Sequence, residues 1–140
     1  MARNTGKPSE EEFVDHWQRQ GKRAFVYKFE DAAALFGKNK KAVANDAKPC
    51  DFIVVTPEET IWSEVKSTEH ETRFPFSMIR RGQIGFAKQI VAAGGRYIFF
   101  VHSLKLNRWF AIPAGHLLMI RKDGKKSLSW EEMEQFSCAI

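Results

Sequence analysis

An unbroken run of aromatic and β-branched residues at positions 97–102 (YIFFVH) is the feature that most constrains the fold of this chain. Such a run is typical of a strand in the interior of a sheet. Two more strands are predicted upstream, at residues 51–56 (DFIVVT) and 60–66 (TIWSEVK), and residues 57–59 between them are typical of a turn. The chain is therefore predicted to build its core on a sheet that contains a hairpin and this central strand.

Helices are predicted before the hairpin, between the hairpin and the central strand, and near the end of the chain. The first begins at Ser9, where Glu12 completes a capping box, and ends at Gly21. The second covers residues 78–93, where apolar residues recur with helical spacing. The last is short and is capped by Ser129.

Two further strands complete the predicted core, at residues 24–29 and 108–112. The order is then helix, three strands, helix, strand and strand, which predicts an α/β fold with a mixed central sheet flanked by helices. The 140 residues show no repeat and no break in composition, so a single domain is predicted. Residues 1–8 are expected to form a loose arm, and residues 37–48 a basic loop.

Three polar residues stand at unusual places in the predicted hairpin. Asp51 opens a strand that is otherwise apolar. Glu64 and Lys66 are two residues apart on the next strand, so both side chains point to one face of the sheet. Two carboxylates and an ammonium group in one place suit the hydrolysis of phosphodiesters. A cluster of surface ion pairs is the alternative interpretation of the same residues.

The predicted chemistry depends on a hard divalent cation. Two carboxylates can hold Mg²⁺, with Mn²⁺ as a substitute, because these ions prefer oxygen ligands. Such a cation activates a bound water and stabilises charge on phosphorus, and a lysine can position that water. Cys50 and Cys138 are isolated and the four histidines are scattered, so neither zinc nor thiol chemistry is indicated. Cys50 is expected to be a packing residue.

The motif at residues 49–51 (PCD), followed by residues 64–66 (EVK), resembles the P-x-D…(D/E)-x-K signature of the restriction-endonuclease-like nucleases. In this chain the motif falls on a predicted hairpin that follows a helix and a strand, which is the context that the signature requires. The resemblance implies the αβββαβ core of that superfamily.

A closer resemblance is to the RecU-type Holliday junction resolvases. It is carried by residues 64–68 (EVKST), residues 74–76 (FPF), Gln83 in a helix, and the Gly-Gly pair at 94–95 before an aromatic strand. Residues 6–10 (GKPSE) resemble the start of RecU-type and Hjc-type resolvases. The resemblance implies a nuclease that resolves four-way (Holliday) junctions by paired symmetric nicks.

Paired nicks need two active sites, so the resemblance also implies a homodimer with two-fold symmetry. Within each site, Asp51 and Glu64 would bind the metal, with the Val65 carbonyl as a further ligand. Lys66 would assist the attacking water, and Glu10 would complete the site from the first helix.

Glu10 and Gln83 each have an alternative interpretation. Glu11 and Glu12 are rival ligands to Glu10, and acidic residues in a first helical turn also stabilise the helix dipole. Gln83 lies among large apolar residues of its helix, where a glutamine needs a buried partner or a role. Ordering water or the scissile phosphate is the expected role, and ordinary solvent exposure is the alternative.

Basic residues in three places are expected to contact DNA phosphates, and solvated surface charge is the alternative. They are Arg80 and Arg81 at the start of the second helix, Arg73 before it, and Lys38, Lys40 and Lys41 in the basic loop. The formal net charge of +5 agrees with a polyanionic partner.

Two other functions remain open. One is a nuclease of the same fold that acts on duplex, flap or end substrates, and the other is a non-catalytic DNA-binding protein. The second would be marked by loss of an acidic residue or the lysine, whereas all three are present here. No apolar run approaches the ~20 residues of a membrane span, and no signal peptide opens the chain. The expected location is the cytoplasm of a bacterium or of a phage-infected host, with both thiols free.

Overall fold

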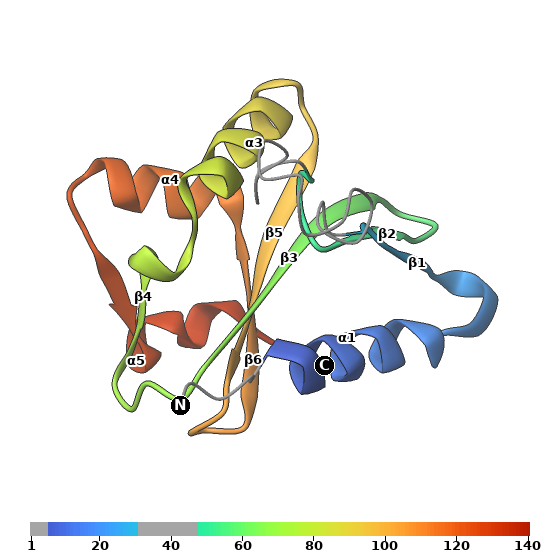
Figure 1. Cartoon of the computed structure of the whole chain (residues 1–140), viewed down its shortest axis with the longest axis horizontal. Helices are drawn as coiled ribbons and strands as arrows, with labels where there is room; N and C mark the ends of the chain where they lie inside the picture. The colour runs from blue at the N-terminus through green and yellow to red at the C-terminus, as the bar shows by residue number, and fades with distance from the viewer. Residues whose placement is uncertain (1–5, 31–47) are drawn as a thin grey trace, which may run out of the picture.

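The computed structural model describes residues 6–30 and 48–140, and Figure 1 shows their arrangement. The strands are β1 (Phe25–Lys28), β2 (Phe52–Val55), β3 (Thr60–Thr68), β4 (Arg73–Pro75), β5 (Arg96–Ser103), β6 (Arg108–Pro113), β7 (Ser127–Ser129) and β8 (Ser137–Cys138). The α-helices are α1 (Gly6–Gln18), α3 (Arg81–Ala92), α4 (Ala114–Lys122) and α5 (Trp130–Met133). Short 3-10 helices are η1 (Gly21–Arg23), η2 (Phe76–Met78) and η3 (Glu134–Phe136).

Six strands form the central sheet, in the order β1-β2-β3-β5-β6-β8, and β4 pairs with β7 in a separate two-stranded sheet. β3 and β5 run parallel, whereas the other neighbouring strands run antiparallel. A parallel pair needs a crossover, and α3 supplies it between β3 and β5. The predicted α/β class with a mixed sheet and the predicted hairpin are thereby confirmed.

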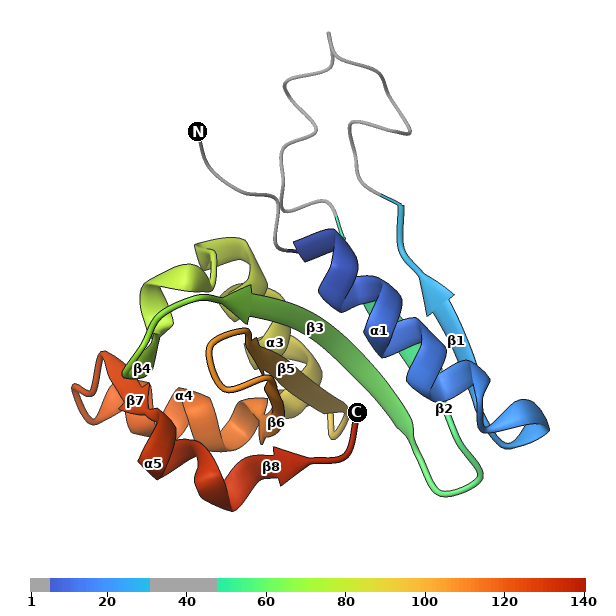
Figure 2. The ribbon, with the colours of Figure 1, turned by 90° about the horizontal axis from the view of Figure 1, so that it is seen from below.

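Helices cover both faces of the sheet. Figure 2 shows α1 on one side of β3 and β5, with α3 and α4 on the other side. Successive residues of β5 enter opposite layers of the core: Ile98 and Phe100 pack with the α1 layer, and Tyr97, Phe99 and Val101 pack with the α3 and α4 layer. The run that the sequence marks as a central strand is therefore buried on both faces.

The start of α1 differs from the prediction. The helix begins at Gly6 rather than after Ser9, so residues 6–8 belong to the helix and not to a loose arm. Ser9 is buried, and its Oγ lies 2.8 Å from Nδ1 of His102 on β5. The Glu12 carboxylate accepts a hydrogen bond from Trp109 Nε1 at 3.1 Å. The predicted capping box is therefore wrong, because these side chains bind the sheet instead of the helix end.

Several short elements were not predicted. The stretch 67–77, where no element was predicted, contains the end of β3, all of β4 and the start of η2, and α3 begins at Arg81 instead of residue 78. The part of the chain after β6, where only the short helix capped by Ser129 was predicted, also contains α4, β7 and β8. β4 has only three residues, and its partner β7 follows about fifty residues later, so no local pattern marks the pair. The predicted cap at Ser129 is confirmed, because its side chain accepts a hydrogen bond from the backbone N–H of Glu132.

Lys38, Lys40 and Lys41 of the expected basic loop lie outside the described residues. Within the described part, the β1 and β2 residues Phe25, Tyr27 and Val55 are exposed although they are large and apolar. None of the described helices combines the length and the apolar character that crossing a membrane demands.

We expect Phe13→Ala to lower the free energy of unfolding by about 3–5 kcal/mol, as is usual when a buried phenylalanine is truncated. Phe13 is 0% exposed, and its ring lies 5.1 Å from the Phe52 ring and 4.9 Å from the Phe100 ring. Urea denaturation would measure the loss. Phe25→Ala is the matched control, since Phe25 is 60% exposed, and its cost should stay below about 1 kcal/mol. Equal losses in the two variants would contradict this assignment of the core.

Candidate active site

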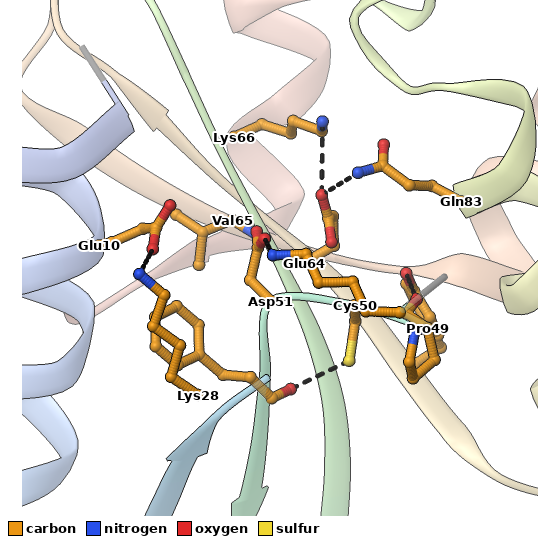
Figure 3. Close-up of polar contacts among 12 residues, drawn as sticks. Glu10, Lys28, Pro49, Cys50, Asp51, Glu64, Val65, Lys66 and Gln83 are labelled. Carbon is orange, nitrogen blue, oxygen red and sulfur yellow. Dashed lines mark hydrogen bonds and ion pairs between the residues drawn. The ribbon is translucent and has the colours of Figure 1, made fainter. Parts of the chain in front are cut away.

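Side chains from α1, the β2–β3 hairpin and the start of α3 line one hollow of about 420 Å³. Figure 3 shows these side chains converging from the separate elements. The hollow contains most of the predicted site residues, namely Glu10, Asp51, Glu64, Val65, Lys66, Arg80 and Gln83. These residues belong to four different predicted segments of the chain, and the fold brings them together.

Asp51 is held in position by the hairpin. Its backbone N–H donates to the Ser63 carbonyl at 3.1 Å, which extends the β2–β3 pairing by one residue. Its Oδ2 accepts a hydrogen bond from the Val65 N–H at 2.9 Å, and its Oδ1 lies 3.3 Å from Nζ of Lys48. The carboxylate therefore has a defined orientation before any ligand binds.

Glu64 is almost completely buried, at 2% exposure. Its Oε2 accepts a hydrogen bond from the Gln83 side-chain amide and lies 3.4 Å from Nζ of Lys66. Its Oε1 is buried and has no hydrogen-bond partner among the described residues. Because a buried carboxylate oxygen without a partner is costly, this atom is suited to accept a ligand.

Burial and, to a smaller extent, the neighbouring Asp51 carboxylate raise the pKa of Glu64, which is about 8 in all. The ammonium groups of Lys66 and Lys48 oppose this shift. The buried carboxylates of Asp51 and Glu64 repel each other, so a proton or a cation is needed to stabilise the pair.

The donor set fits a hard divalent cation. Asp51 and Glu64 supply carboxylate oxygens, and the unpartnered Oε1 of Glu64 is available for coordination. In the described part of the chain, no three acidic, histidine or cysteine side chains are placed to hold a metal together. A site with two carboxylates suits Mg²⁺, which keeps several of its waters when bound to proteins. Asp51 and Glu64 are thus the residues that would hold the ion.

Two lysines of the site were not predicted as site residues. Lys48 was placed in the basic loop, yet its ammonium group pairs with Asp51, and its spacing of three residues was the available signal. Lys28 on β1 lines the hollow and lies 3.2 Å from the Glu10 carboxylate. No local pattern links Lys28 to Glu10, because only the packing of α1 on the sheet brings them together. Glu10 therefore faces the hollow with a cation already beside it.

Gln83 joins α3 to the site. Its Nε2 donates to Glu64, while its Oε1 accepts a hydrogen bond from the Arg80 N–H at 3.0 Å and so caps the first turn of α3. Gln83 therefore has a buried partner, Glu64, and its expected role in ordering water or the scissile phosphate stays a prediction. Arg80 lines the hollow, Arg81 is exposed beside it, and Arg73 lines a different hollow on the far side of η2.

Cys50 packs beneath the site, as predicted. It is 1% exposed, and burial raises the pKa of its thiol to about 12, so the thiol stays protonated at neutral pH. Its Sγ lies 3.1 Å from the Phe52 carbonyl oxygen. On the same side, Tyr97 donates a hydrogen bond to the Pro49 carbonyl at 2.8 Å, which secures the entry to β2.

Comparison with known proteins matches the chain to a family and to solved structures of the same fold. The family model described as "Recombination protein U" matches residues 13–140. The structure of Hjc from Archaeoglobus fulgidus, described as a Holliday junction resolvase, superposes with a TM-score of 0.58 at 10% sequence identity. The superposition covers 94% of this chain and 91% of that chain, so the two share a fold. No curated protein matches the sequence.

The burial of Glu64 predicts a pH-dependent stability of the metal-free protein. Because the pKa of Glu64 is higher in the folded state than in the unfolded state, the contribution of its protonation to stability is fully present below about pH 4.5 and is lost as the pH rises through about 8. Glu64→Gln removes this titration. In EDTA, we therefore expect the Tm of Glu64→Gln to gain on that of the wild type between pH 5.5 and pH 8.5. In a domain of this size, a Tm gain of roughly 3–5 °C corresponds to about 1 kcal/mol of unfolding free energy.

Differential scanning fluorimetry measures both proteins at each pH. Glu58→Gln is the matched control, since Glu58 lies exposed in the hairpin turn and should track the wild type throughout. A constant Tm difference between Glu64→Gln and the wild type across this range would show that Glu64 does not titrate there.

Proposed function

The chain belongs to the Recombination protein U (RecU) family, and from this premise we propose that it is a metal-dependent endonuclease that resolves four-way DNA junctions. The fold shared with the archaeal Hjc resolvase agrees with this function. The proposed reaction is hydrolysis: a bond forms between a water oxygen and phosphorus, and a phosphorus–oxygen bond of the DNA backbone breaks.

The observation that carries the proposal is the juxtaposition of Asp51, Glu64 and Lys66. One buried oxygen of Glu64 lacks a partner, while the other is held by Lys66 and Gln83. A purely structural ion-pair cluster would leave no such oxygen, because an unsatisfied buried acceptor is destabilising. The arrangement therefore supports a ligand-binding role for these residues.

Each residue has a proposed task. Asp51 and Glu64 would hold Mg²⁺, with the Val65 carbonyl as a further ligand. When bound, this ion supplies Lewis-acid stabilisation of charge on phosphorus and an acidified water. Lys66 would orient the attacking water and stabilise charge that develops on the phosphate oxygens. Gln83 would keep the Glu64 carboxylate in its orientation.

Other parts of the proposal extend from this site. Glu10 on α1 would supply a further carboxylate to the metal ion once its ion pair with Lys28 is loosened. Arg80 and Arg81 would contact phosphates beside the hollow, and Arg73 would contact DNA farther away. The natural setting would be the cytoplasm, and the 140 residues would act as a single nuclease domain.

The active-site assignment is tested with a synthetic four-way junction and a linear duplex of matched sequence. In Mg²⁺ we expect symmetric nicks in the junction, no cutting in EDTA, and no cutting by Asp51→Asn. Lys66→Ala should reduce the rate by about 10²–10³-fold, the usual cost of losing one group that stabilises a transition state. Denaturing gels that resolve each labelled strand measure the products.

Asp15→Asn is the matched control for Asp51→Asn. Asp15 is exposed on α1, and its variant should cut like the wild type. If the linear duplex is cut as fast as the junction, the protein is a general nuclease and not a junction resolvase. Binding of the junction without cutting in Mg²⁺ or Mn²⁺ would favour a non-catalytic DNA-binding protein.

Paired nicks lead us to propose that the protein acts as a homodimer with two-fold symmetry. Light scattering coupled to gel filtration should give twice the monomer mass at the concentration used for cleavage. A mass of one chain at that concentration, with paired nicks still formed, would contradict the dimer.

A further inference from the structure

A second hollow, of about 700 Å³, lies on the other side of η2 from the active site. It is formed by β4, by the start of β7 and by the loop that joins α4 to β7. Among the residues that the structure describes, four basic side chains and no acidic side chain line it. They are Arg73, Arg121, Lys125 and Lys126. Nothing in the proposed chemistry uses this hollow.

The walls of this hollow are held together by hydrogen bonds. β4 pairs with β7, and the Phe76 N–H donates to the Lys126 carbonyl at 2.9 Å, which ties the loop to η2. Gly124, at a φ of +97°, allows the chain to reverse after α4 in a conformation that other residues rarely adopt. The basic residues thus come from three segments that the backbone fixes relative to one another.

The positive charge of the hollow is largely uncompensated. Lys125 pairs with Glu132 at 2.7 Å. Arg73, Arg121 and Lys126 have no ion pair with any residue that the structure describes. Ser77 and Ser127 add hydroxyl groups to the lining. Guanidinium, ammonium and hydroxyl groups together are the donors that bind backbone phosphates of nucleic acids.

The two hollows share one wall, the segment of residues 76–80. Met78 and Arg80 line the active-site hollow, whereas Ser77 and Ile79 line the second hollow. Figure 1 shows the chain running from β4 directly into α3 along this wall. A DNA backbone that leaves the active site past Arg80 therefore needs to cross only this segment to reach the second hollow.

We propose that the second hollow binds the phosphate backbone of the substrate DNA next to the cleaved site, and so holds one arm of the junction across the wall of residues 76–80. This inference rests on the proposed nuclease function and adds a contact surface that is separate from the catalytic hollow. The ligand is a run of phosphates in duplex DNA, bound without reading its sequence, because the polar side chains of the lining are all basic or hydroxyl groups.

The test is a charge reversal, Arg121→Glu with Lys126→Glu, measured by fluorescence anisotropy on a labelled four-way junction without divalent cations. We expect the Kd to rise at least tenfold near 0.1 M salt. The slope of log Kd against log salt concentration should fall by about 2, since each lost phosphate contact contributes about 0.9 to it. Lys22→Glu with Lys88→Glu is the matched control, because it changes the net charge equally at exposed positions outside both hollows.

Junctions with progressively shorter arms give a second readout. The wild type should lose affinity once the arm is too short to reach the second hollow, whereas the double variant should bind long-armed and short-armed junctions alike. Arg73→Glu, on β4, probes the same hollow from a separate strand and should weaken binding in the same direction. Circular dichroism and Tm establish that each variant is folded.

The possible failures can be told apart. If the wild type cuts junctions and the double variant binds them with the wild-type Kd and salt slope, the second hollow has no part in DNA binding. An equal loss of affinity in the control pair would overturn the inference too, because it would reduce the effect to net charge. If the wild type neither binds nor cuts any junction, the proposed nuclease function itself fails.

Discussion

The parallel pairing of β3 with β5 is the interaction on which the rest of the molecule depends. It places β3 in the interior of the sheet, with Glu64 opposite Phe99 and Lys66 opposite Val101. Because a parallel connection requires a crossover, it also brings α3 back over the sheet. The amide of Gln83 is thereby delivered to the Glu64 carboxylate. If β3 were an edge strand, Glu64 would not be buried and α3 would not place Gln83 beside it.

Placing a carboxylate at the centre of a sheet has a cost in stability. Glu64 has lost nearly all its contact with water, and the negative charge of the neighbouring Asp51 carboxylate repels its own. Lys66 and Gln83 satisfy only one of its two oxygens. The metal-free protein is therefore strained at the position where a cation would bind, and binding of a cation would relieve this strain. Functional sites commonly carry such a local cost, which the rest of the fold supports.

The same architecture arranges the surfaces around the site. α1 brings Glu10 from one face of the sheet, and α3 brings Arg80 and Gln83 from the other. The segment that enters α3 then separates the active-site hollow, where carboxylates and ammonium groups are mixed, from the basic hollow beside β4 and β7. A polyanion would be attracted to the basic hollow, where no carboxylate of the described residues faces it. The proposed catalytic hollow and the proposed binding hollow thus lie on opposite sides of the segment of residues 76–80.

Local patterns along the chain specify several parts of this protein. The apolar run at 97–102 and the alternation in the hairpin specified the central strands, and their polar exceptions, Asp51, Glu64 and Lys66, marked the site. The capping box at Ser129 was also readable, because both of its partners lie within one helical turn. A glutamine on an apolar helix stripe correctly signalled that Gln83 has a buried partner.

Only the tertiary structure decided which distant residues meet. Ser9 and Glu12 have the pattern of a helix cap, yet both bind groups on β5 and β6, more than ninety residues away, because buried partners outcompete a local hydrogen bond at a solvated helix end. The pairing of β4 with β7, the placement of Lys28 beside Glu10, and the gathering of basic residues into a second hollow follow from packing alone. Periodicity and spacing describe neighbours along the chain. Contacts between elements depend on how their surfaces fit, and this information is spread over the whole fold.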